Sequence, residues 1–119
     1  MRLVDTVSVR KLDEVITSCG GGVSVIRLLK LDAQGYELKV LKGAVKTLRS
    51  GRIKAIKFEL APKWLLAQQT SAVEVCNELR RFGYSVLSQT GRPMDCAAVG
   101  QDEVQDAVAL APGVSYTPV

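Results

Sequence analysis

Two carboxylates stand at the ends of apolar segments that are suited to buried strands. Asp32 follows the apolar residues 25–31, and Glu59 lies near the end of residues 53–61. A helical segment separates the two strands, so we expect them to be parallel, with their carboxyl ends at one edge of the sheet. Ligands bind at this edge in open α/β sheets. The chain contains no histidine, which excludes a general acid or base of that type, and Asp32 or Glu59 could instead face a ligand at this edge.

A structural role stays open for each of these carboxylates. Asp32 precedes a helical segment, where its side chain could accept backbone N–H groups and the helix dipole favours an anion. Glu37 has the same possible role in the first helical turn. Glu59 has no evident helix to cap, which favours a functional site, although Lys57 could form an exposed ion pair with it.

Hydrophobic periodicity predicts the elements that would position these side chains. In the first half we expect a strand at residues 7–9, a helix from about residue 12 and a glycine turn at 20–22. A strand at 23–32 follows, whose nearly continuous apolar sequence predicts that both of its faces are covered. One helix then runs from residue 37 and stops at Gly51. The second half is predicted to contain a strand at residues 53–61, ended by Pro62. After it come a helix opened by a Ser71–Glu74 capping box and closed at Gly83, and two strands at 84–89 and 95–100. Residues 101–119 have weak periodicity, so we expect a domain at 1–100 and a loosely ordered tail at 101–119.

The formal charge of +4 does not identify a nucleic-acid partner. Lysines and an arginine recur along residues 39–49, but only 5% of the chain is aromatic and no aromatic side chain lies among them. The stacking half of single-strand recognition is therefore missing, and we interpret this basic stretch as a solvated helix face.

The cysteines predict neither a metal site nor a disulfide. Cys19, Cys76 and Cys96 are widely spaced and odd in number, and there is no Cys-x-x-Cys pair. Without histidine, a zinc site built on closely spaced ligands is excluded, and we expect reduced thiols in a reducing compartment. The first residues are too charged for a secretory signal and no apolar run has membrane-spanning length. We therefore expect a cytoplasmic protein with no membrane partner.

Residues 28–61, LLKLDAQGYELKVLKGAVKTLRSGRIKAIKFELA, resemble the FkbM family of methyltransferases. The family pattern is a strand ending K-[IL]-D-x-[EQ]-G-x-E, a helix [LV]-x-V-L-x-G-A and a strand ending in Glu. The residues that match it are Lys30, Asp32, Gln34, Gly35, Glu37, Val40, Leu41, Gly43, Ala44 and Glu59. The resemblance also includes Leu12 with Asp13 and Gly83 with Tyr84, and covers roughly residues 5–100.

The resemblance implies a class I methyltransferase sheet, which is Rossmann-like, with parallel strands, flanking helices and an antiparallel C-terminal strand pair. It also implies S-adenosylmethionine as the cofactor and methyl transfer to the hydroxyl of a small molecule or saccharide. Asp32 would lie near the transferred methyl group and Glu59 close by, so both are the implied catalytic residues. Asp32 and Gly35 are the implied cofactor-binding residues, and no metal ligand is implied.

The chain departs from the family pattern at its beginning. The family's first strands, with the glycine-rich loop for the cofactor, would precede residue 5, so the resemblance implies the C-terminal part of the domain with the N-terminal cofactor-binding strands missing. The strand at residues 25–31 would then have an open edge, through which we expect self-association. A non-catalytic α/β binding module derived from a methyltransferase is the alternative function.

Overall fold

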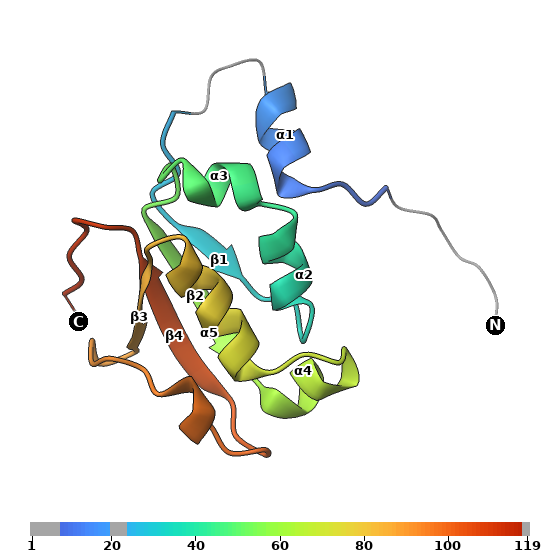
Figure 1. Ribbon diagram of the computed structural model, residues 1–119, viewed down its shortest axis with the longest axis vertical. Coiled ribbons are helices and arrows are strands. Elements are labelled where there is room, and N and C mark those ends of the chain that lie inside the picture. Colours follow the sequence, from blue (N-terminus) through green and yellow to red (C-terminus); the bar gives the residue numbers. More distant parts are fainter. Residues whose placement is uncertain (1–7, 20–23, 118–119) are drawn as a thin grey trace.

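The computed structural model describes residues 8–19 and 24–117 (Figure 1). The elements of the first half are α1 (Leu12–Ser18), β1 (Leu29–Leu31), α2 (Glu37–Lys42), α3 (Val45–Arg49) and β2 (Ala55–Leu60). They are followed by α4 (Pro62–Ala67), α5 (Ala72–Arg81), β3 (Ser85–Ser88), the 3-10 helix η1 (Cys96–Ala98) and β4 (Gln105–Leu110). The protein is thus a small α/β structure.

The four strands form one mixed sheet in the order β1-β2-β4-β3. β1 and β2 are parallel, and β4 is antiparallel to both β2 and β3. The parallel first pair and an antiparallel pair at the C-terminal end are therefore confirmed. The second member of that antiparallel pair is not the predicted one, because β4 lies in the segment that was expected to be a tail.

Helices cover one face of the sheet. Figure 1 shows α2, α3 and α5 on the same side of the strands. Along β2, the side chains of Ile56, Phe58 and Leu60 are buried beneath these helices, whereas Lys57 and Glu59 on the other face are exposed. The expectation that both faces are covered was wrong for β1, where Lys30 is exposed, and β2 is exposed on the same face. The open face carries the charged side chains of the strands.

The first predicted strands differ from the observed ones. Of residues 7–9, residue 7 lies outside the described residues and 8–9 form no strand; the glycine turn at 20–22 also lies outside them. Regular pairing in the predicted strand 23–32 is confined to Leu29–Leu31. Ile26 forms an isolated parallel bridge to Ile53, and a bend at Arg27 interrupts the ladder between that bridge and β1.

The single helix predicted after Glu37 is two helices, α2 and α3. The helix is interrupted at Gly43, whose carbonyl accepts a hydrogen bond from the Asp13 N–H at 3.0 Å. The Asp13 carboxylate then accepts the N–H groups of Lys46 and Thr47, both at 2.9 Å, and so caps α3 from the side of α1. A Cβ on Gly43 would lie 3.4 Å from the Cβ of Lys11, so Gly43 allows close packing against the start of α1.

Two helices, α4 and α5, follow β2 in the sequence, and only α5 was predicted. Pro62 does end the strand, but it also occupies the first turn of α4, where its missing N–H costs nothing. The capping box of α5 is confirmed, because the Ser71 hydroxyl accepts the Glu74 N–H at 3.2 Å. α5 then buries Val75, Cys76 and Leu79 against the sheet.

The last third of the chain corrects three expectations. β4 lies between β2 and β3, and Ala107, Val108, Ala109 and Leu110 are buried, so the loosely ordered tail was wrong for this segment. The strand expected at residues 95–100 contains η1 instead. Cys96 in η1 forms a disulfide with Cys76 of α5, so the reduced state expected for these two cysteines was also wrong; Cys19 is free and exposed. No helix among the described residues is long and apolar enough to cross a bilayer.

Candidate functional site

Three carboxylates form a row across the open face of the sheet, at the carboxyl end of β1 and β2. Leu31 pairs with Phe58, so Asp32 and Glu59 follow at neighbouring positions one residue further along. Glu59 in turn lies opposite Asp106 of β4. Side chains alternate between the two faces of a strand, and therefore all three project on the face away from the buried Leu31 and Phe58. We call Asp32, Glu59 and Asp106 the carboxylate row.

A second row, of two lysines and a valine, lies next to the carboxylate row on the same face. Lys30, Lys57 and Val108 are paired across β1, β2 and β4, two residues before Asp32 and Glu59. The ion pairs within the described residues join neighbours on or beside a helix, Arg10–Glu14 at 4.0 Å and Arg81–Glu78 at 2.8 Å. The lysines are thus near the carboxylates without forming ion pairs with them.

The carboxylate row lines a small cavity of about 150 Å³. Its other lining residues are Lys30, Leu31, Lys57 and Phe58. The structure therefore brings the two sequence-predicted catalytic residues, Asp32 and Glu59, to one site. Asp106 was missed because residues 101–119 were not assigned a strand; the run Ala107–Leu110 was the signal that could have revealed it.

Asp32 does not cap the following helix, which was the structural alternative for it. α2 begins after Tyr36 without a side-chain cap. Glu37 takes over the backbone groups of the turn: its carboxylate accepts the Ala33 N–H at 2.9 Å and the Gly35 N–H at 3.0 Å. These two hydrogen bonds from Ala33 and Gly35 to Glu37 fix the turn without Asp32. The Asp32 side chain therefore remains exposed on the open face.

Among the described residues, Glu37 is the one charged side chain that is buried, with 3% of its surface exposed. Burial raises the pKa of Glu37; the hydrogen bonds from Gly35 and Ala33 oppose this rise, and the negative charge of Asp32 adds to it. Glu37 holds the turn rather than facing the cavity of the carboxylate row. In the described structure Glu37 therefore fixes the turn between Asp32 and α2.

The backbone conformation and the close approach of α4 explain why residue 35 is a glycine. Its φ of +104° lies in the region that L side chains rarely adopt, and a Cβ there would lie 2.4 Å from the carbonyl oxygen of Trp64 in α4. Gln34 before it also has a positive φ, of 49°. Gly35 is not among the residues that line the cavity of the carboxylate row, so its predicted cofactor contact stays a prediction.

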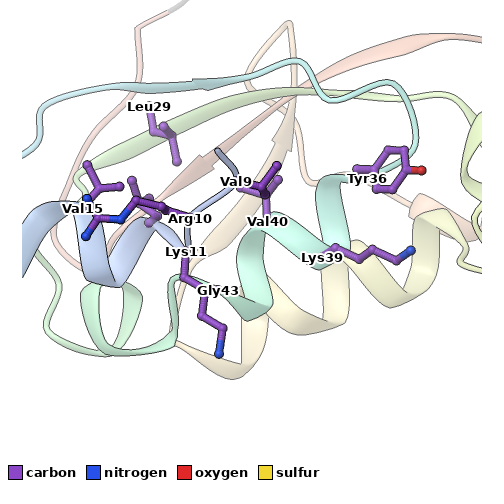
Figure 2. A pocket seen from close by; sticks show the side chains of 10 residues that line it. Val9, Arg10, Lys11, Val15, Leu29, Tyr36, Lys39, Val40 and Gly43 are labelled. Carbon is purple, nitrogen blue, oxygen red and sulfur yellow. The ribbon is translucent and has the colours of Figure 1, made fainter. Parts of the chain in front are cut away.

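A much larger cavity, of about 750 Å³, lies between α1, α2 and β1 (Figure 2). We call it the apolar groove; its apolar side chains are Val9, Leu12, Val15, Leu29, Tyr36 and Val40. Figure 2 shows Leu29 pointing from β1 toward the helices, with Tyr36 and Lys39 at one end of the groove. Arg10, Lys11 and Lys39 form its basic rim.

The described residues contain no arrangement of three or more His, Cys, Asp or Glu side chains that could hold a metal ion. The carboxylate row therefore lies along the sheet without converging on one point. What it offers is a line of hydrogen-bond acceptors beside two ammonium groups. Such a site can accept hydrogen bonds from hydroxyl groups and take up a proton.

Comparison with known proteins gives one family. A model described as the methyltransferase FkbM domain matches residues 4–86, which is well over half of the chain. The match includes Asp32 and Glu59 and ends in β3, before Asp106. No curated protein and no solved structure matches the chain.

Proposed function

Because the chain belongs to the FkbM methyltransferase domain family, we propose that it serves S-adenosylmethionine-dependent methyl transfer to the hydroxyl of a small molecule or saccharide. One observation supports this most directly: Asp32 and Glu59 lie side by side on the open face at the carboxyl edge of the parallel pair. Neither is used to cap a helix or to form an ion pair in the described residues.

The sheet supports a class I methyltransferase arrangement. β1 and β2 would be the fourth and fifth strands of that fold, with a helical crossover between them. β3 and β4 supply the antiparallel pair expected near its C-terminal end. In this arrangement the carboxylate row lies at the edge where an open α/β sheet binds its ligands.

The described residues do not enclose the whole cofactor. Sites for ligands of this size have volumes of about 300–1,000 Å³, whereas the cavity of the carboxylate row has about 150 Å³. The apolar groove is large enough, but no carboxylate lines it that could bind ribose hydroxyls. We therefore derive no step through the cofactor, and assign to this chain the handling of the acceptor.

The carboxylate row accounts for acceptor binding and for the fate of the proton. An acceptor hydroxyl donates a hydrogen bond to Asp32 or Glu59, which orients its oxygen. When the oxygen is methylated its proton must leave, and the same carboxylate takes it. Asp106 adds an acceptor at the end of the row for a neighbouring hydroxyl, as a polyhydroxylated molecule would offer.

The test begins with calorimetric titration of S-adenosylmethionine into the full chain. The proposal requires saturable binding, followed by formation of S-adenosylhomocysteine when sugars are supplied as acceptors. At least one of the variants Asp32→Asn and Glu59→Gln should reduce turnover about 100-fold or more, because one of these two carboxylates is the general base. Asp102→Asn, at an exposed position outside the carboxylate row, is the matched control.

Unchanged turnover in Asp32→Asn and Glu59→Gln would remove their assigned role. Absence of cofactor binding would favour the second candidate, a non-catalytic binding module. The observation that favours this alternative is the lack of a cavity of cofactor size at the carboxylate row.

A further inference from the structure

Asp106 connects the carboxylate row to a second polar cavity. It lines the cavity of the carboxylate row and also a cavity of about 270 Å³ at the adjacent ends of β3 and β4. Because Ser88 ends β3 and Gln105 begins the antiparallel β4, the second cavity lies at the same edge of the sheet as the carboxylate row. We call it the β3–β4 pocket; its lining residues are Ser88, Gln89, Thr90, Val104, Gln105 and Asp106.

The β3–β4 pocket does not depend on how the outer side of β1 is paired. The strand order is β1-β2-β4-β3, so β1 and β2 lie between the pocket and any strand that pairs with the outer side of β1. All of the lining residues fall within residues 88–106, which the structure describes without a gap. The pocket is therefore formed by the two last strands and the turns that adjoin them.

Local hydrogen bonds hold the polar side chains of the β3–β4 pocket in place. The hydroxyls of Ser88 and Thr90 lie 3.0 Å apart and pair with each other. The Gln105 amide donates to Oε2 of Glu103 at 2.9 Å, and Oε1 of Glu103 accepts the Gly100 N–H at 2.8 Å. Because these side chains are already positioned, less conformational entropy is lost when a ligand binds.

The chemistry of the β3–β4 pocket matches a sugar ring. Two hydroxyls, two side-chain amides and the Asp106 carboxylate can exchange hydrogen bonds with ring hydroxyls. Val104 adds one apolar side chain, 62% exposed, against which the C–H face of a ring can pack. No lysine or arginine is among the described lining residues, so the pocket lacks the side chains that bind phosphate groups. A neutral polyhydroxylated ring therefore fits the pocket better than a phosphorylated one.

We propose that the β3–β4 pocket binds a second, neutral sugar ring of the acceptor, while the ring that carries the methylated hydroxyl lies at the carboxylate row. Asp106 lines both cavities and accepts a hydroxyl of either ring. The cavity of the carboxylate row alone, about 150 Å³, is below the usual range of about 300–1,000 Å³ for small-molecule sites, and the two cavities together reach it. The placement of the methylated ring rests on the proposed function, and the inference narrows the acceptor to a saccharide of two or more rings.

Calorimetric titration of sugars into the full chain without cofactor tests the β3–β4 pocket separately from methyl transfer. The probes are maltose, cellobiose, lactose and N,N′-diacetylchitobiose, each compared with its constituent monosaccharides. At least one disaccharide is expected to bind at least about tenfold more tightly than its monosaccharides, a difference of about 1.4 kcal/mol.

Protein variants test the location of binding. Thr90→Val combined with Gln105→Leu removes a hydroxyl and an amide from the pocket at similar volume, and should weaken disaccharide binding about tenfold while monosaccharide binding changes less than about twofold. Thr17→Val combined with Gln101→Leu makes the same exchanges at exposed positions outside the pocket and should leave both affinities unchanged. Circular dichroism checks the fold. Thr90→Val alone, at an exposed position, should weaken disaccharide binding about threefold and serves if the double variant does not fold.

Two results would overturn the proposal. One is that no disaccharide of the panel binds more tightly than its monosaccharides, and the other is that the pocket variant and the control variant lose affinity equally. Formation of S-adenosylhomocysteine is measured separately. Disaccharide binding without this product would support the β3–β4 pocket and count against methyl transfer. Methylation of monosaccharides with no gain from a second ring would support methyl transfer and remove the pocket.

Discussion

Asp13 joins α1 to α3 through three hydrogen bonds. Its carboxylate accepts the Lys46 and Thr47 N–H groups and the Thr47 hydroxyl, the last at 2.6 Å. We expect Asp13→Asn to lower the free energy of unfolding by about 1–2 kcal/mol, because an amide nitrogen cannot accept these donors. Urea unfolding measures the change. Glu14→Gln, in the neighbouring exposed position, is the control and should change it little.

The contribution of Asp13 should disappear in acid. Burial acts to raise the pKa of Asp13, but the hydrogen bonds from Thr47 and Lys46 outweigh it and leave the pKa below its ordinary value. A lowered folded-state pKa gives stability that is present above the unfolded pKa and is lost as the pH falls through the folded pKa. The stability difference between the wild type and Asp13→Asn should therefore narrow as the solution is acidified below the ordinary range of aspartate. A constant difference would contradict the assignment.

Alanine substitutions at Gly35 and Gly51 separate two costs of an added Cβ, the backbone strain at positive φ and the steric contact with a neighbouring element. Both have positive φ, but a Cβ at Gly35 meets the Trp64 carbonyl, whereas one at Gly51 meets nothing within 4 Å. Gly51→Ala should cost about 1–2 kcal/mol from backbone strain alone. Gly35→Ala should cost at least about 1 kcal/mol more, because α4 must also shift. Thermal unfolding of the two variants measures both; equal losses would show that α4 yields without cost.

The Cys76–Cys96 disulfide links α5 to η1 across 20 residues that include all of β3. A loop of this length restricts the unfolded chain by about 3 kcal/mol in the chain-entropy model. We expect the Cys76→Ser, Cys96→Ser double variant to lose up to that amount in urea unfolding, whereas Cys19→Ser should lose little, because Cys19 is free and exposed. Intact mass before and after reduction checks the bond. A double variant as stable as the wild type would show that the disulfide is dispensable.

Elements with strong local signals could be predicted from the sequence. The capping box at Ser71, the glycine stop at Gly51 and the alternation along β2 each depend on neighbouring residues, and each was found. The side-by-side placement of Asp32 and Glu59 also followed, since a parallel crossover fixes it.

The parts that could not be predicted depend on residues far apart in the sequence. The break between α2 and α3 is made by Asp13, 33 residues before Lys46. β4 has weak periodicity because Val108 and Leu110, on the face opposite to that of Ala107 and Ala109, are also buried, so that the usual alternation is lost. Asp106 was missed with β4, and the disulfide was missed because sequence spacing does not show which cysteines approach each other.

The whole sheet depends on β4. It is the strand between β2 and β3, which do not pair with each other. A chain ending at Gly100 would lose β4, and we expect it not to fold, as shown by loss of the cooperative unfolding transition. A chain ending at Val114 keeps β4 and should unfold cooperatively, with a small loss from the absent Tyr116–Gln89 hydrogen bond. A folded chain ending at Gly100 would refute the central role of β4.

The position of β4 also bears on how the protein is synthesised. β2 and β3 leave the ribosome before β4, although β4 is the strand that both of them pair with. Until β4 follows, each has an open edge toward the place that β4 will take, and open edges pair readily with other unfinished chains. The nascent protein is therefore most in need of a chaperone between synthesis of Leu60 and synthesis of Leu110, and slow translation across that interval should increase aggregation.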